Sequence, residues 1–85
     1  MTRYLVETYL GREEGRERAE REQRARSAAQ AAHVRFEQSI HVPEDEICFY
    51  VFEAPSSRDA ALVAERAGLD PVRVVEAVSS GEENT

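Results

Sequence analysis

The stretch EICFYVFEAP, residues 46–55, decides the fold of this chain. Its aromatic and β-branched residues predict a strand, and a strand packed on a single core would alternate apolar and polar side chains. This stretch is apolar on both faces instead. One face carries Ile47, Phe49 and Val51, and the other carries Cys48, Tyr50 and Phe52. We therefore expect a central strand whose two faces are both covered.

The preceding stretch VRFEQSIHV, residues 34–42, alternates and predicts a half-buried strand. Its expected core positions are Val34, Phe36, Ile40 and Val42. Turn residues follow at 43–45, so the two strands should form a hairpin. If Val42 lies opposite Ile47, the apolar faces of both strands agree. The pairs on the second face are then His41 with Cys48, Ser39 with Tyr50, and Glu37 with Phe52.

The first 32 residues predict a strand and a helix. RYLVETYL, residues 3–10, has strand composition and ends at Gly11. From Arg12 to about Ala32, glutamates and arginines recur four residues apart in the order that stabilises a helix, and we interpret them as its solvated face. Small residues supply the buried side, namely Ala25, Ala28, Ala29 and Ala32.

A second helix and a last strand follow the hairpin. Ser56 and Asp59 match a capping box, which predicts a helix to about Ala67 with Gly68 as its left-handed end. VRVVEAV, residues 72–78, predicts a fourth strand. We expect one domain at residues 1–79 and a flexible polar tail at 80–85.

This order of elements predicts an α+β, ferredoxin-like βαββαβ fold with an antiparallel sheet of order 4-1-3-2 and both helices on one face. The other face would then be bare. Leaving an apolar strand face in water would forgo several kcal/mol at about 25 cal/mol per Å². A second copy packed sheet to sheet would cover it, so we expect a homodimer with a ligand pocket between the two sheets.

Composition excludes several classes of function. The net charge of −6 disfavours nucleic-acid binding. ALVAERAGLDPVRVVEAV, residues 61–78, superficially matches a helix-turn-helix, but its valines favour a strand. No membrane span or secretory signal is present, and Cys48 is the only cysteine, so a cytoplasmic location is expected.

Residues of the hairpin carry the candidate chemistry. Ser39, Cys48, Tyr50 and Phe52 would line the pocket between the sheets, and His41, Cys48 and Glu37 would bind a transition metal with help from a partner chain. The alternative is that His41 and Cys48 have no chemical role and are a half-exposed strand histidine beside a buried, inert thiol. His33 would complement the end of the first helix, or act as a further metal ligand.

Catalysis remains an alternative. Cys48 could serve as a nucleophile with His41 as its base, or His41 or Tyr50 could transfer protons in a cofactor-free reaction. No P-loop, GxGxxG, HExxH or GxSxG motif is present. Binding is therefore favoured over catalysis.

Three segments carry a resemblance to a known family: RYLVE (3–7), SIHVPEDEICFYVFEAPS (39–56) and AERAGLDPVRVVEAV (64–78). Together they resemble a family of small bacterial ferredoxin-like domains of unknown function that includes a nickel-binding protein. The resemblance implies a dimeric α/β barrel and nickel as a possible metal, without assigning ligand positions in this chain. Barrels of this type also include cofactor-independent monooxygenases and isomerases, which is an analogy of fold alone.

Overall fold

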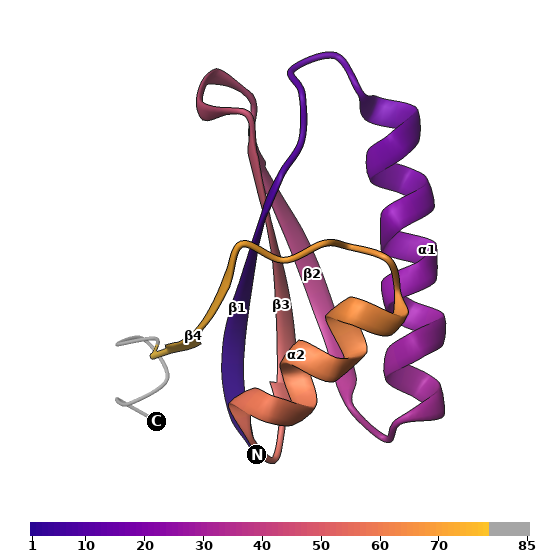
Figure 1. Ribbon diagram of the computed structural model, residues 1–85, viewed down its shortest axis with the longest axis vertical. Coiled ribbons are helices and arrows are strands. Elements are labelled where there is room, and N and C mark those ends of the chain that lie inside the picture. Colours follow the sequence, from indigo (N-terminus) through magenta and orange to yellow (C-terminus); the bar gives the residue numbers. More distant parts are fainter. Residues whose placement is uncertain (79–85) are drawn as a thin grey trace.

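The computed structural model describes residues 1–78 and contains one sheet with two helices (Figure 1). The strands are β1 (Thr2–Tyr9), β2 (Arg35–Val42), β3 (Ile47–Ala54) and β4 (Arg73–Ala77). The helices are α1 (Gly15–Ala31) and α2 (Ser57–Arg66), and the 3₁₀ turn η1 (Pro43–Asp45) joins β2 to β3. The sheet is antiparallel with the order β2-β3-β1-β4. The predicted ferredoxin-like fold is confirmed, and the expected boundary at residue 79 and tail at 80–85 lie outside the described residues.

Local signals place α2. Ser56 is its N-cap, and the Ser56 hydroxyl accepts a hydrogen bond from the Asp59 backbone N–H at 3.1 Å. Gly68 has a φ of 71° and ends the helix in the left-handed region, which glycine adopts without strain. β4 begins shortly afterwards, so the apparent helix-turn-helix is a helix followed by a strand.

The carboxyl-terminal half of α1 attaches this helix to the domain. Of the four alanines expected on the buried side, Ala25 and Ala29 are buried, and Ala28 and Ala32 are partly buried against the core. The Arg24 Nε atom donates to the Ala67 carbonyl at 2.8 Å, and the Arg26 guanidinium lies 5.1 Å from the centre of the Phe36 ring. Small side chains allow close packing at this end of α1.

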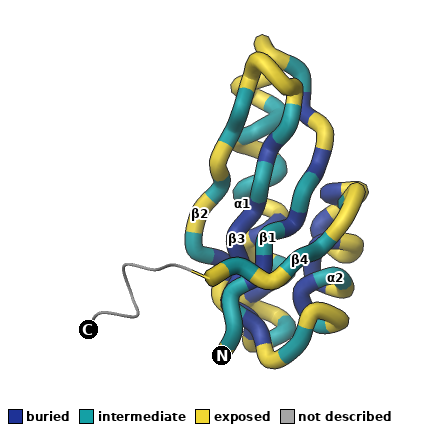
Figure 2. The backbone as a smooth tube through the Cα atoms, turned by 90° about the vertical axis from the view of Figure 1, so that its left-hand side faces the viewer, coloured by how far each residue is buried: buried dark blue, intermediate teal, exposed yellow. Residues whose placement is uncertain are grey.

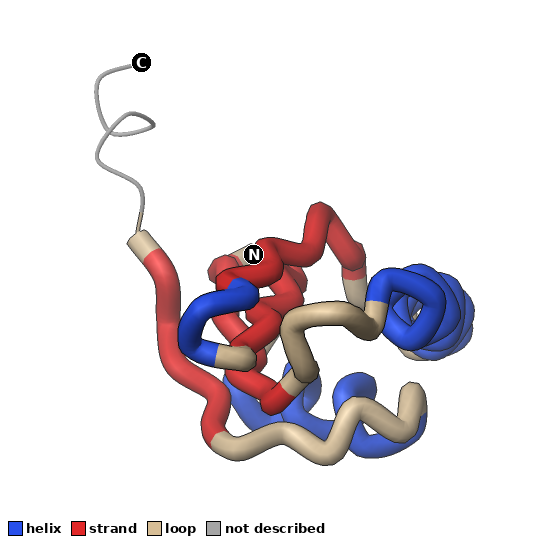
Figure 3. The backbone as a smooth tube through the Cα atoms, turned by 90° about the horizontal axis from the view of Figure 1, so that it is seen from above, coloured by secondary structure: helices blue, strands red, loops and turns tan. Residues whose placement is uncertain are grey.

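Both helices cover one face of the sheet, and we call it the covered face. Seen from above, α1 lies to the right of the strands and α2 below them (Figure 3). The fully buried side chains of the two central strands point to this face: Val6 and Thr8 from β1, and Cys48, Tyr50, Phe52 and Ala54 from β3. We expected Cys48, Tyr50 and Phe52 on the bare face, and that assignment is wrong. Period-two alternation separates two faces but does not say which of them the helices occupy.

A bulge in β2 also changes the expected pairing. Phe36 lies opposite Phe52, but the next pair is Gln38 with Val51, so Glu37 is an extra residue. The predicted pair of Glu37 with Phe52 is therefore wrong. An inserted residue reverses the alternation, and for this reason Phe36 belongs to the core whereas Ile40 and Val42 point to the opposite face.

That opposite face, the open face, is apolar at its centre. Its apolar side chains are those of Leu5, Ile40, Val42, Ile47, Phe49, Val51 and Val75. Ile40 is 43% exposed. Figure 2 looks from the side of the strands and shows intermediate exposure along much of the sheet. The helices leave this surface uncovered.

Candidate functional site

Two strands bring the sequence-predicted site residues together beneath α1. His41 lies opposite Cys48, and Ser39 lies opposite Tyr50, which confirms the predicted register at these positions. Because cross-strand partners share a face, all four side chains belong to the covered face that carries the buried Cys48 and Tyr50. The site therefore lies within one subunit, and the expectation of a pocket between two sheets is wrong for these residues.

The amino-terminal half of α1 faces them with charged residues. Helical spacing continues the alanine stripe backwards from Ala25 to positions 21, 22 and 18, which are Arg21, Glu22 and Arg18. A helix that packs only for stability would place apolar residues there. Sequence reasoning assigned these three residues to the solvated face, although the spacing that located the alanines could have identified them.

Hydrogen bonds join these charged residues to the sheet. The Arg18 guanidinium donates to the Ser39 hydroxyl and to the Ser39 carbonyl, each at 3.3 Å. The Ser39 hydroxyl donates in turn to the Glu22 carboxylate. Arg21 donates to the Tyr9 carbonyl at 2.9 Å and to the Glu17 carboxylate at 3.0 Å. Polar contacts therefore hold this half of α1 on the sheet.

Two buried polar atoms of the cluster lack partners. Among the described residues, neither the Tyr50 hydroxyl nor His41 Nε2 makes a hydrogen bond of normal geometry, although the Cys48 thiol and the Arg21 guanidinium approach the Tyr50 hydroxyl. Tyr50 itself is fully buried, with 0% of its surface exposed. By contrast, the buried Thr8 hydroxyl donates to the Cys48 carbonyl at 2.8 Å. An unpartnered buried group lowers stability by about 1–3 kcal/mol, so such groups call for an explanation.

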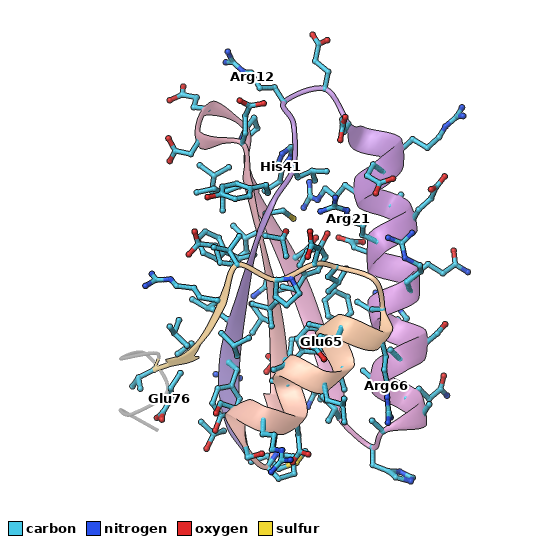
Figure 4. All side chains as sticks on the ribbon, viewed as in Figure 1. Arg12, Arg21, His41, Glu65, Arg66 and Glu76 are labelled. Atoms are coloured by element: carbon cyan, nitrogen blue, oxygen red, sulfur yellow. The ribbon has the colours of Figure 1, made fainter. Side chains whose placement is uncertain are left out.

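Figure 4 shows how the cluster is arranged, with His41 and Arg21 pointing into the same space between the sheet and α1. Tyr50 lies near both the Cys48 thiol and the Arg21 guanidinium. Burial raises the pKa of the Cys48 thiol, although Tyr50 and the two nearby arginines oppose the shift. Burial likewise raises the pKa of the Tyr50 phenol. Both groups are therefore protonated at neutral pH, which disfavours Cys48 as a thiolate nucleophile.

Substituting Tyr50→Phe is expected to stabilise the protein by about 1 kcal/mol, because it removes the unpartnered hydroxyl and keeps the ring. Urea denaturation at pH 7 measures the change. Tyr9→Phe is the control for loss of a phenol hydroxyl outside the core, since Tyr9 is 66% exposed in the single chain and lies at the end of β1, opposite Ile47. A Tyr50→Phe variant less stable than wild type would show that the hydroxyl is satisfied in the folded protein.

The predicted metal ligands do not converge. The Glu37 carboxylate accepts a hydrogen bond from Arg3 Nε at 2.7 Å and lies away from the other two candidates, because the bulge turns it to the open face. His33 is exposed just beyond α1, with a φ of 59°. Within residues 1–78, no three histidine, cysteine, aspartate or glutamate side chains are grouped as a metal site requires. His41 and Cys48 alone are too few ligands for a tight metal site.

A surface depression opens at the same end of the sheet. It has a volume of about 680 Å³ and is lined by Gly11, Arg12, Glu13, Glu14, Pro43 and Glu46. Pro43 follows His41 by two residues, and the Glu46 carbonyl accepts a hydrogen bond from the Leu10 N–H at 2.8 Å. The depression therefore lies beside the end of the hairpin that carries His41.

Comparison with known proteins establishes the fold alone. No family model matches the sequence. No curated protein matches it either. The structure is similar to the crystal structure of SCO4226 from Streptomyces coelicolor A3(2), with a TM-score of 0.81 and 20% sequence identity. The match covers 92% of this chain and 98% of the Streptomyces chain. In the described part of the chain, neither helix has the length and apolar character that crossing a membrane requires.

Proposed function

We propose that this protein is a small homodimeric binding protein whose subunits pair through their open faces and hold a ligand beneath α1. One observation supports the proposal: the open face of the sheet is apolar, and the covered face is polar at one end, where it carries unpartnered groups. An apolar open face favours a partner, and polar groups under a helix favour a ligand.

A second copy of the chain suits the open face in size. The central strands are eight residues long, and four strands at about 4.8 Å spacing and about 3.3 Å rise present about 500 Å² per subunit. Two such faces bury about 1,000 Å² together, which reaches the lower limit of a specific interface. A domain of this size also has a thin core, to which a second sheet would add.

Four charges on the open face are already paired within one subunit. Arg3 contacts Glu37 at 2.7 Å, and Arg73 contacts Glu7 at 2.9 Å, each within one subunit. These ion pairs link neighbouring parts of the sheet. Four charges of this face can therefore enter an interface already neutralised, which lowers the penalty for desolvating them.

Native mass spectrometry of protein purified without a metal-affinity tag tests the proposal, because it reports stoichiometry and retained metal together. We expect a dimer at micromolar concentration, without a stoichiometric metal ion. A monomer across the concentration range would overturn the pairing of subunits. A dimer that retains one nickel ion per subunit would show instead that the protein is a metal carrier with ligands beyond His41 and Cys48.

A further inference from the structure

We propose that the cluster beneath α1 binds a small neutral molecule that carries a hydroxyl group, such as a phenol. This inference rests on the proposed binding function and names the ligand class for it. It does not depend on the pairing of subunits. The two unpartnered atoms, the Tyr50 hydroxyl and His41 Nε2, are the groups that would contact the ligand.

Strand register puts the side chains that carry these two atoms on one face as near neighbours. His41 and Cys48 are cross-strand partners, and Tyr50 follows Cys48 by two residues on the same face. The histidine and the tyrosine are therefore diagonal neighbours, a separation of about 7–8 Å between backbones that long side chains bridge. One ligand oxygen between them can serve both.

Hydrogen-bonding chemistry selects a hydroxyl for that position. The pKa of Tyr50 is raised, so its phenol keeps its proton and can donate. Imidazole Nε2 either donates or accepts, depending on the tautomer. A hydroxyl group accepts from Tyr50 and can donate to or accept from His41, so it satisfies both atoms in either case.

Charge selects a neutral ligand. Arg21 is paired with Glu17 at 3.0 Å, and Arg18 lies 3.9 Å from Glu22, so the arginines near the cluster already have carboxylate partners. Glutamates at 13, 14 and 46 line the adjacent depression and repel anions. Arg12 is the one basic residue lining the depression, against three glutamates. A carboxylate ligand would therefore meet a net negative charge beside the cluster and already paired arginines within it.

Aromatic neighbours favour an aromatic body for the ligand. The Phe36 ring lies 6.3 Å from the Tyr50 ring and 5.4 Å from the Phe52 ring, measured between centroids. An aromatic ligand beside Tyr50 would add one more tilted ring contact to these three rings. The apolar and polar parts of a phenol thus match the two parts of the site.

Titrations of the full-length protein with phenol, benzene and benzoate, followed by amide NMR shifts, test the inference. We expect saturable binding of phenol with shifts centred on residues 39–41 and 48–50. Benzene lacks the hydroxyl and benzoate carries a charge, and each should bind at least tenfold more weakly. The Tyr50→Phe variant should bind phenol at least tenfold more weakly and bind benzene unchanged, whereas Tyr9→Phe should match the wild type.

Equal affinities for phenol and benzene, or an unchanged phenol affinity in Tyr50→Phe, would overturn the inference. So would the absence of saturation, which would mean that the two atoms share an internal water only. Sedimentation of the same samples separates this result from the pairing of subunits. A monomer that binds phenol as described supports the site and overturns the dimer, and a dimer that binds none of the probes does the reverse.

Discussion

The Phe49→Asp variant is expected to be monomeric at concentrations where the wild type is a dimer. Phe49 lies at the centre of the open face, between Ile40 of β2 and Glu7 of β1. In a symmetric pair the substitution places one unpaired carboxylate from each subunit between the sheets. Burying a charge without a partner costs about 3–5 kcal/mol, which weakens association more than a hundredfold.

Light scattering coupled to gel filtration at about 50 µM, which is above the roughly micromolar Kd of a modest interface, measures the effect. Leu62→Asp is the matched control, because Leu62 is 40% exposed on α2 and lies off the sheet. Circular dichroism must show that both variants are folded. A folded Phe49→Asp variant that remains a dimer would place the interface on another surface.

The sequence predicted the order of elements because strong local signals punctuate this chain. Ser56 and Gly68 bound α2 by capping chemistry that acts within a few residues. The hairpin register followed from aligning Val42 with Ile47, and both remained aligned on one face. Capping and pairing rules were sufficient to predict these features, because each depends only on residues that are close in sequence.

Which face the helices cover could not be predicted, since that choice depends on the whole chain. Both faces of β3 are apolar, so alternation alone gave two equivalent assignments. The alternation of β2 could not decide between them either. The bulge at Glu37 puts the apolar residues before it and those after it on different faces of the sheet. The bulge itself had no turn residue or glycine to mark it.

The sequence predicted the strand residues of the candidate site but not those of α1. His41, Cys48, Tyr50 and Ser39 were correctly grouped, since their grouping needed only the register. The contribution of α1 was missed because Glu17 and Arg21 form an i, i+4 ion pair of the kind expected on the solvated face of a helix. Their paired charges concealed that Arg21 also reaches the sheet, where its guanidinium donates to the Tyr9 carbonyl.

Alkaline pH is expected to destabilise the protein steeply, beginning near pH 9. The pKa values of Cys48 and Tyr50 are raised in the folded protein, the first cause in each case being burial. A raised pKa means that the folded state retains a proton that the unfolded state releases. Stability is therefore complete below the unfolded pKa values, about 8.5 for cysteine and about 10 for tyrosine, and falls as pH rises above them. Each group contributes a slope of up to about 1.4 kcal/mol per pH unit.

Urea denaturation between pH 7 and pH 11 separates the two contributions, because they begin at different pH values. The stability of the Tyr50→Phe variant should change with pH in parallel with the wild type up to about pH 10 and then decline with roughly half the slope, since only the thiol still titrates. Tyr9→Phe should keep the full slope, because it leaves the buried Cys48 thiol and Tyr50 phenol in place. If Tyr50→Phe and wild type declined in parallel above pH 10, the phenol would be able to ionise within the folded protein. Tyr50 would then be reached by solvent or by a cationic partner, and Arg21 is the nearest candidate on the covered face.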